Sequence, residues 1–290
     1  MYKNNNRGYL GEDFRIFSLK DDAGVDIGYH HHDFYKIVFF ISGKAQYSVE
    51  GKVYNLKPWD ILLINKHEIH KCVADKSEPY ERIVIWLRDD IEEKDKYFKD
   101  MTNCFKHIND DGTHLLRLKE NSCNTVKNLM TKIVKYNNSK LSYDIALKNS
   151  FLIQFLVIVN KSYSKNNSRD INKDIFYDET TEQLISYINN NLNKSLKIEE
   201  LSEELGLSKH YLMRRFKNQT GYSIHNYIVQ KRLIYALELM RHNTCMYEVS
   251  EQVGFNDYST FVRAFKRNYN ISPKKYLEGN GKVDTFNLID

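Results

Sequence analysis

The sequence has few cysteines and no long apolar run, and both shortages exclude whole classes of protein. Its four cysteines in 290 residues form no CxxC pair, which argues against a zinc site or a disulfide framework. The amino terminus, MYKNNNRGYLGEDFR, lacks the apolar segment of a signal peptide. The longest apolar run, residues 151–159, is broken by Gln154 and is far shorter than the ~20 residues of a membrane span. We therefore expect a cytoplasmic protein without a membrane segment.

A strong excess of charge of one sign is also missing. The formal net charge is +5 over 290 residues, which is modest for a protein that binds nucleic acid. The distribution of charge along the chain must therefore indicate the partner. The length exceeds that of one ordinary domain and suits two, since domains usually have roughly 100 to 200 residues.

Hydrophobic periodicity divides the chain into a β-rich front and a helical back. Between about residues 14 and 88, short β-type runs such as YKIVFFI, AQYSVE and YERIVIWL alternate with turn signals, which predicts an antiparallel barrel. From about residue 121 the period becomes helical. The polar segment KSYSKNNSRDINKD, which starts at Lys161, has no periodicity and predicts an interdomain linker.

We therefore expect a multidomain α+β protein. Its first domain, residues 1–160, combines a barrel over about 14–88 with helices over about 121–160. A linker over 161–177 follows. Residues 178–280 then form an all-α domain.

An internal repeat marks the last third of the chain. The segment LSEELGLSKHYLMRRFK, from Leu201, aligns with VSEQVGFNDYSTFVRAFK, from Val249, with one additional residue in the second turn. Each copy reads as two helices around a glycine, Gly206 or Gly254, followed by a helix N-cap, Ser208 or Asn256. This is the pattern of a helix-turn-helix.

The second helix of each copy presents a basic face. In the first copy Leu212 and Phe216 must face the core, and in the second Phe261 and Phe265 must do so. Ordinary amphipathic helix pairs also have charged outer faces, but a repeat of both the turn and the basic face favours DNA recognition. The outward-facing residues are Lys209, His210, Met213, Arg214 and Lys217 in the first copy, and Asp257, Tyr258, Arg263, Lys266 and Arg267 in the second.

These motifs resemble the DNA-binding domain of the AraC/XylS family of regulators, over about residues 198–276. The matching elements are LGLSKHYLMRRFK, TGYS, Arg232 and Ala236, VGFNDYSTFVRAFK and SPKKY, whereas Asn270 stands where the family usually has glycine. The resemblance implies a long helix, about 225–241, that places two recognition helices in successive major grooves ~34 Å apart. It implies base contacts by His210, Met213, Arg214, Tyr258, Ser259 and Arg263. It also implies double-stranded promoter DNA and RNA polymerase as partners, and a role more often activating than repressing.

The front of the chain resembles a cupin. The run GVDIGYHHHDFYKIVFFISG, residues 24–43, has the spacing of the first cupin motif, with Lys36 at its glutamate position. In the second motif Trp59 and His67 occupy glycine places, Asn65 the proline place and His70 the histidine place. The order of a cupin-like domain before an AraC-type domain implies control by a small molecule, often a carbohydrate and in other members a fatty acid.

Strand alternation predicts that His30 and His32 point into the barrel beside His70. Three imidazoles and a carboxylate would bind a metal, but Lys36 replaces the carboxylate with a cation, so we expect neither a metal nor another cofactor. A pocket for a hydroxyl-rich or anionic effector fits these residues better, although ordinary core packing remains open for the aromatic ones, Tyr35 among them. The candidate pocket residues are His30, His32, Lys36, Tyr47, Trp59 and His70.

Two further alternatives concern assembly and function. The apolar stripe of Ile145, Leu152, Phe155, Leu156 and Val159 either packs within its own domain or forms a homodimer interface. A metal-dependent cupin enzyme fused to DNA-binding helices is disfavoured by Lys36. A structural DNA binder without a ligand leaves the front domain with no use. We therefore expect a DNA-binding regulator, not an enzyme.

Overall fold

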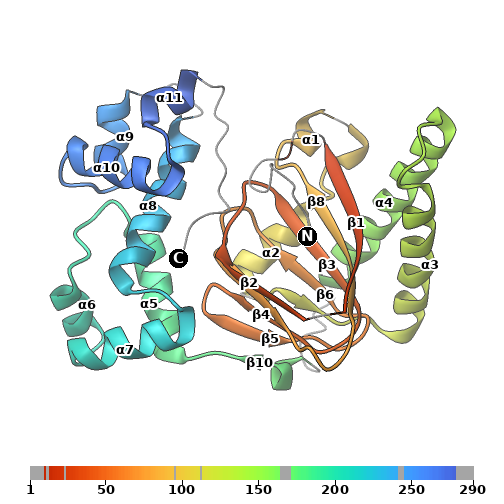
Figure 1. Ribbon diagram of the computed structural model, residues 1–290, viewed down its shortest axis with the longest axis horizontal. Coiled ribbons are helices and arrows are strands. Elements are labelled where there is room, and N and C mark those ends of the chain that lie inside the picture. Colours follow the sequence, from red (N-terminus) through yellow and green to blue (C-terminus); the bar gives the residue numbers. More distant parts are fainter. Residues whose placement is uncertain are drawn as a thin grey trace. The chain divides into compact units, whose positions relative to one another are not determined.

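The computed structural model describes residues 10, 13–22, 24–94, 96–111, 113–163, 171–240 and 245–278. The chain divides into two compact units. We call the first, Leu10–Val49 with Val53–Phe176, the barrel domain, and the helical part from Tyr177 onward the helical domain. The strand-rich front and the all-helical back are those predicted (Figure 1).

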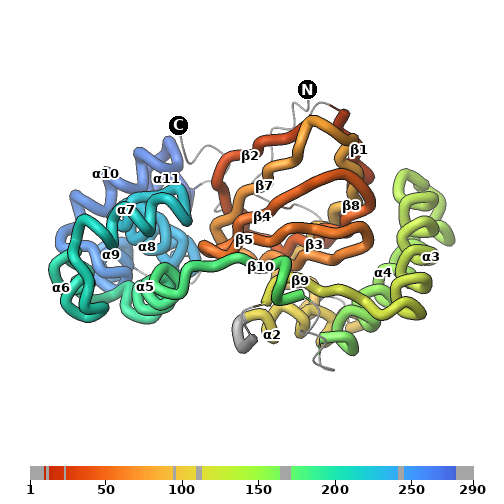
Figure 2. Tube along the Cα trace, turned by 90° about the horizontal axis from the view of Figure 1, so that it is seen from below, coloured from red at the N-terminus to blue at the C-terminus, as the bar shows by residue number. Residues whose placement is uncertain are grey.

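In the barrel domain, antiparallel strands form two sheets among the described residues, with orders β1-β8-β3-β6-β9 and β10-β5-β4-β7-β2 (Figure 2). Strand β3 is paired on both sides, with Ile37 opposite Ile85 of β8 and Leu63 of β6. The strands are β1 (Phe14–Asp21), β2 (Val25–His30), β3 (Tyr35–Ser42), β4 (Ala45–Val49), β5 (Lys52–Asn55), β6 (Ile61–Ile64), β7 (His70–Ala74), β8 (Tyr80–Leu87), β9 (Leu115–Leu116) and β10 (Ile175–Phe176).

The sheet that contains β3 is buried on both faces. Successive side chains of a strand point to opposite faces. Accordingly, Ile37 and Phe39 belong to the cluster formed with the helices, whereas Val38 and Phe40 belong to the cluster formed with the second sheet. This is why YKIVFFI is a continuous apolar run rather than an alternating one.

Helices cover the outer face of this sheet. They are α1 (Ile91–Lys94), η1 (Lys96–Phe98), α2 (Asn103–Asp111), α3 (Glu120–Tyr136) and α4 (Ser142–Tyr163), of which α3 and α4 lie side by side (Figure 1). By length and composition alone, α4 is apolar enough to cross a membrane. One side of it, however, packs into the core through Leu152, Phe155, Leu156 and Val159, all fully buried. These four residues of the predicted stripe therefore pack within their own domain, while Ile145 is 39% exposed.

The segment predicted as a linker is ordered at both of its ends. Residues 161–163 continue α4, and residues 164–170 lie outside the described part of the chain. Ile171 is buried in the core between the sheets, η3 (Asn172–Asp174) follows, and β10 pairs with β5. Asp174 also accepts hydrogen bonds of 2.8 Å from Lys57 Nζ and Arg117 Nη1. The end of the predicted linker is therefore part of the barrel domain.

The helical domain is built around one long helix, α8, which corresponds to the helix predicted at about 225–241. It starts one residue earlier, and Arg241 lies outside the described residues. We call α5–α7 the first half and α9–α11 the second half. The helices are α5 (Glu179–Asn190), α6 (Ile198–Glu204), α7 (Lys209–Thr220), α8 (Ile224–Met240), α9 (Met246–Gln252), α10 (Tyr258–Tyr269) and α11 (Pro273–Glu278).

Each half packs against a different stretch of α8. In the first half the ring of Phe216 lies edge-on to Tyr227, at 5.4 Å between centroids. In the second half Leu233 and Leu237 join Phe261 and Phe265 in one buried cluster. The pairs predicted to face the core, Leu212 with Phe216 and Phe261 with Phe265, are all buried.

Candidate DNA interface and ligand site

The first helix-turn-helix has the local geometry that its sequence predicts. Gly206 has φ +63°, a left-handed conformation that glycine adopts without strain. Ser208 caps α7, because its Oγ accepts a hydrogen bond from the amide of Tyr211. Gly221 ends α7, again with a positive φ of 77°. The turn and both caps thus fix where the exposed face of α7 begins and ends.

The second helix-turn-helix differs from the prediction at its cap. Asp257, not Asn256, caps α10, since its Oδ1 accepts a 2.8 Å hydrogen bond from the amide of Thr260. The extra residue in this turn moves the cap one position along. Hydrogen bonds from Thr260 also lower the pKa of the Asp257 carboxyl, which keeps it ionised at the helix N-terminus. At the other end Asn270 has φ +58°, so it performs the C-cap role expected of glycine.

The predicted DNA-contacting side chains are all exposed on α7 and α10. Met213, the apolar member of the set, is 48% exposed. The exposed residues are Lys209, His210, Met213, Arg214 and Lys217 on α7, and Tyr258, Ser259, Arg263, Lys266 and Arg267 on α10.

Some of these cations have partners within the protein. Lys209 Nζ lies 2.6 Å from Glu199 Oε1 of α6, and this hydrogen bond lowers the pKa of the Glu199 carboxyl. Arg263 Nη2 donates to Thr260 Oγ1 at 3.1 Å. Exposed ion pairs such as Lys209–Glu199 contribute little to stability, so a phosphate can readily take the place of Glu199.

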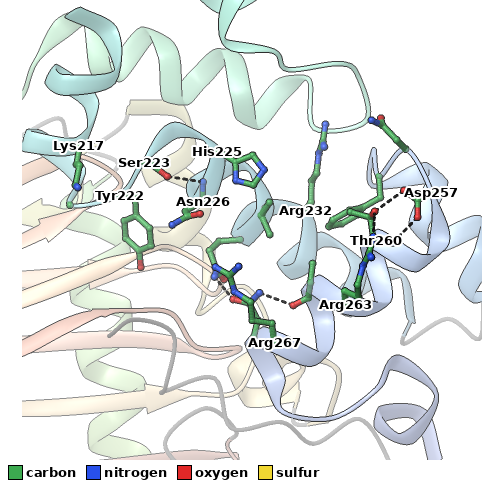
Figure 3. A pocket seen from close by; sticks show the side chains of 17 residues that line it. Lys217, Tyr222, Ser223, His225, Asn226, Arg232, Asp257, Thr260, Arg263 and Arg267 are labelled. Carbon is green, nitrogen blue, oxygen red and sulfur yellow. Dashed lines mark hydrogen bonds between the residues drawn. The ribbon is translucent and has the colours of Figure 1, made fainter. Parts of the chain in front are cut away.

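A cleft of about 970 Å³ lies along α8 between the two helix-turn-helix motifs (Figure 3). Lys217 lines one end, and Arg263 and Arg267 line the opposite side, so the cleft carries several cations. A second hollow of about 770 Å³ shares Lys217 and includes Met213 and Arg214. The exposed faces of α7 and α10 therefore open onto adjoining hollows.

Sequence reasoning missed the floor of this cleft. Ser223, His225 and Asn226, at the start of α8, line it together with the predicted cations (Figure 3). Ser223 Oγ accepts a hydrogen bond from the amide of Asn226, and the amino end of a long helix attracts anions. The available signal was the TGYS motif, whose serine directly precedes α8.

In the barrel domain, three histidines and a lysine converge. The rings of His30 and His70 lie 4.1 Å apart, and those of His32 and His70 lie 4.8 Å apart. Lys36 Nζ lies 3.3 Å from His70 Nε2. We call His30, His32, Lys36 and His70 the buried basic cluster, because each is at most 9% exposed.

The histidines of the buried basic cluster share one hydrogen-bond pattern. Each Nδ1 lies within hydrogen-bond distance of a backbone carbonyl: that of Gly28 for His30, Phe34 for His32 and Glu68 for His70. If these nitrogens donate, every Nε2 is an acceptor, which suits the ammonium of Lys36 beside His70. His32 Nε2 is buried without a hydrogen-bond partner in the described structure.

Burial sets the charge of this cluster. Desolvation, followed by the nearby positive charge of Lys36 and the neighbouring His30, lowers the pKa of His32 well below its usual value. The pKa of His70 falls for the same reasons, with His30 as the larger neighbour. Desolvation also lowers the pKa of Lys36 to about 8. At neutral pH His32 and His70 are therefore neutral beside the cation of Lys36.

Two of the candidate pocket residues lie differently from the rest. Tyr47 is near the cluster, with its ring centroid 5.9 Å from Lys36 Nζ, and its hydroxyl lies 3.0 Å from that of Tyr80. Trp59 instead packs among the residues beneath the helices, with Lys127 Nζ 3.9 Å from its ring centroid. The prediction that Trp59 lines the same pocket as the histidines is therefore wrong. Its backbone has φ +76°, as the glycine place in the motif requires, and this turns the side chain away.

The comparisons with known proteins match both domains. A family model described as a helix-turn-helix domain matches residues 201–279, and one described as an AraC-like ligand binding domain matches residues 18–91. The chain is 28% identical over 251 residues to the HTH-type transcriptional activator RhaS of Mannheimia succiniciproducens, covering 85% of this chain and 87% of RhaS. It is 23% identical over 262 residues to the lactose operon transcription activator of Staphylococcus xylosus, covering 88% of each. Among solved structures, ToxT from Vibrio cholerae O395 is 18% identical, with 92% of this chain and 97% of ToxT covered and a TM-score of 0.37.

A helix-turn-helix domain behind a ligand-binding domain makes this chain a DNA-binding transcriptional regulator rather than an enzyme. With both models matched and with relatives that are transcriptional regulators over most of their length, the chain belongs to the AraC family.

Proposed function

We propose that this protein activates transcription at promoters that it recognises through both helix-turn-helix motifs, under the control of a small molecule bound in the barrel domain. The observation that carries the proposal is the pair of exposed basic helices, α7 and α10, which open onto two adjoining hollows that share Lys217. The two relatives above are both named as transcription activators, which supports activation and with it RNA polymerase as a partner. Such a role is performed in the cytoplasm, where the DNA is.

The DNA contacts divide by chemistry. His210, Arg214, Ser259 and Arg263 offer hydrogen bonds to base edges, Met213 offers apolar contact to a thymine methyl, and Tyr258 offers both kinds of contact. Lys209, Lys217, Lys266 and Arg267 hold the sugar–phosphate backbone. Between the two grooves, the cleft at the start of α8 provides a place for the intervening phosphates.

Replacement of Arg214 by alanine tests the reading of bases. We expect Arg214→Ala to weaken binding to a specific duplex by ~1–3 kcal/mol and binding to random duplex only slightly, whereas Lys217→Ala weakens both alike. Fluorescence anisotropy measures both affinities, with a duplex selected from a random library by the full-length protein and a scrambled duplex.

Arg215 supplies the matched control. It is a neighbouring exposed arginine whose guanidinium binds Asp178 of the same domain, so Arg215→Ala should leave the ratio of specific to random affinity unchanged. Equal losses on the two duplexes for Arg214→Ala would refute its role in reading bases.

For the effector, the buried basic cluster favours a molecule with several hydroxyl groups or an anionic group. His32 Nε2 is a buried acceptor that a ligand hydroxyl can satisfy, and Lys36 is a donor to a ligand oxygen. A carbohydrate fits this chemistry, and the lactose operon activator among the relatives supports it. A fatty acid would need an apolar channel for its chain beside Lys36.

We also propose that the protein works as a homodimer through the start of α4. Leu141, Tyr143, Ile145 and Leu147 are 39–64% exposed, and only 22% of the apolar part of α4 is buried. Several exposed apolar side chains within and just before the first two turns of a helix are a feature found at association surfaces. A second copy is the natural occupant, because a dimer doubles the DNA contacts.

Ile145→Glu tests this interface. A charge at a half-exposed position leaves the core intact and should convert a dimer to a folded monomer, as measured by light scattering of the full-length protein. Phe155→Glu is unsuitable because Phe155 is fully buried and its replacement would unfold the domain. Lys140→Glu, an exposed change of charge nearby, is the control. An unchanged mass for Ile145→Glu would reject the interface.

A further inference from the structure

The two halves of the helical domain meet at one point on α8. Before this point the helix packs on the first half, through Ile224, Tyr227 and Ile228, and after it on the second half, through Leu233 and Leu237. Apolar contacts of this kind are not directional, so they do not by themselves fix the angle between the halves. A directional contact between the halves is needed to do so.

Arg232 stands at this point and provides directional contacts. Its Nε donates to the carbonyl of Leu192 at 2.9 Å and its Nη2 to the carbonyl of Lys194 at 2.7 Å, both in the segment between α5 and α6 of the first half. Its guanidinium carbon lies 5.9 Å from the ring centroid of Phe255, in the turn of the second helix-turn-helix. One side chain therefore contacts both halves.

Gly254 allows the two halves to touch directly. A Cβ atom at this glycine would lie 2.2 Å from the carbonyl oxygen of Leu192 and 3.0 Å from Nη2 of Arg232, closer than atoms can approach. The φ of +89° also favours glycine. The turn before α10 is therefore pressed against the backbone of the first half, with Arg232 packed beside the contact.

The electrostatics agree with a positioning role. Burial lowers the pKa of the Arg232 guanidinium, which donates to the neutral carbonyls of Leu192 and Lys194. The planar fork of arginine suits two carbonyls at fixed positions, whereas a lysine ammonium is a single point of charge.

We propose that Arg232, with Gly254 and the carbonyls of Leu192 and Lys194, is the positioning element that fixes the separation of the two recognition helices. It thereby sets the spacing between the two DNA boxes that the protein accepts. This inference rests on the proposed function, in which α7 and α10 bind one duplex together. Two linked binding modules gain affinity from each other only when their geometry lets both engage at once.

The experiment compares spacings. The full-length protein selects a duplex from a random library, and three probes are made from it: the selected duplex, the same duplex with one base pair inserted between the boxes, and a duplex with one box scrambled. One inserted base pair shifts the second box by ~3.4 Å and rotates it by ~34°. Anisotropy gives the affinity of wild type, Arg232→Lys, Gly254→Ala and the cleft control Arg267→Ala for each probe.

We expect wild type to lose about tenfold or more in affinity on the insertion. For Arg232→Lys and Gly254→Ala we expect a loss of about tenfold on the selected duplex, a penalty for the insertion below about threefold, and unchanged affinity for the single-box probe. Arg267→Ala should lose affinity on all three probes by a similar factor, so its penalty for the insertion matches that of wild type.

Three outcomes would overturn the inference. The penalty for the insertion could be the same in Arg232→Lys as in wild type. Arg232→Lys and Gly254→Ala could also lose affinity for the single-box probe and show reduced helical circular dichroism. Arg232 and Gly254 would then contribute only to the stability of the domain. The wild-type protein could select no sequence from the library. This result would refute the proposed function together with the inference, and it differs from the first two outcomes, in which wild type does select a duplex.

Discussion

Phe265→Ala is expected to lower the free energy of unfolding of the helical domain by about 3–5 kcal/mol. The side chain is fully buried, and its ring packs edge-on against Phe261, Tyr269 and Tyr276 at 4.7–5.8 Å between centroids. Its loss removes three aromatic contacts and leaves a cavity at the centre of the second half. Since whole domains are stable by only about 5–15 kcal/mol, this is a large part of the total, and specific DNA binding should be lost at a lower temperature than in wild type.

The two domains can be followed separately in this experiment. Both tryptophans, Trp59 and Trp86, lie in the barrel domain, so their fluorescence reports that domain alone. Far-UV circular dichroism should show an earlier helical transition in Phe265→Ala, while the fluorescence transition stays where it is in wild type. Tyr247→Ala, which removes an aromatic ring that is 62% exposed on α9, should change stability by less than about 0.5 kcal/mol. A helical transition unmoved by Phe265→Ala would contradict the packing described here.

Lys36→Met is expected to have the opposite sign and to stabilise the barrel domain at pH 7 by at most about 3 kcal/mol, because the change also removes the contact of Lys36 Nζ with the buried His70 Nε2. Burial lowers the pKa of Lys36 to about 8 from its usual 10.5. Because each pKa unit is worth about 1.4 kcal/mol, the folded domain is destabilised by roughly 3 kcal/mol while the lysine is charged. Methionine has a similar length and no charge.

The lowered pKa of Lys36 also determines how the stability of the wild-type barrel domain changes with pH. Below pH 8 the lysine is protonated in both the folded and the unfolded state, so the full penalty is present. Between about pH 8 and 10.5 the folded domain loses its proton and the unfolded chain keeps it, so the stability of wild type rises with pH. The advantage of Lys36→Met over wild type, measured by urea unfolding with tryptophan fluorescence, should therefore shrink across this range. A constant difference between the two proteins would refute the assignment.

The same variant tests the ligand site. In a thermal-shift panel of sugars, fatty acids and divalent metals, an effector at a hundred times its dissociation constant should stabilise wild type by ~2.7 kcal/mol. If Lys36 binds the effector, Lys36→Met starts from a higher melting temperature and gains less from that compound. Lys44→Met, at an exposed lysine of the same domain, should respond as wild type does.

The helix-turn-helix motifs could be predicted because their information is local. A glycine, a cap and apolar positions at helical spacing lie within about twenty residues, and the repeat shows them twice. The one error, Asn256 for Asp257, came from an inserted residue whose effect depends on which side chain reaches the amide of Thr260. The strands between residues 14 and 88 were predictable as well, because they are strongly apolar runs between turns, whereas the two-residue strands β9 and β10 were not predicted.

Other features depend on contacts that sequence patterns do not contain. Trp59 and His67 occupy glycine places and have the positive φ values, +76° and +66°, that glycine commonly adopts, but the motif spacing does not contain the direction of the Trp59 ring. The short helices α1 and α2 were not predicted, since a helix of a few residues forms only by packing on the sheet. The docking of Ile171 and Asp174 escaped prediction because their neighbours are polar, and the partner of Asp174, Arg117, is far away in sequence.

That docking has a mechanical consequence. Arg117 binds both oxygens of buried Asp60 at 2.8 Å as well as Asp174, and Asp60 immediately precedes strand β6, which pairs with the strand that carries Lys36. Tyr177 alone separates β10 from Asp178, the cap of α5. A slack tether would dissipate a small displacement over many peptide bonds. Here only Tyr177 lies between the last strand residue paired within the barrel domain and the residue that caps α5, so at this point the two domains are joined without a slack tether.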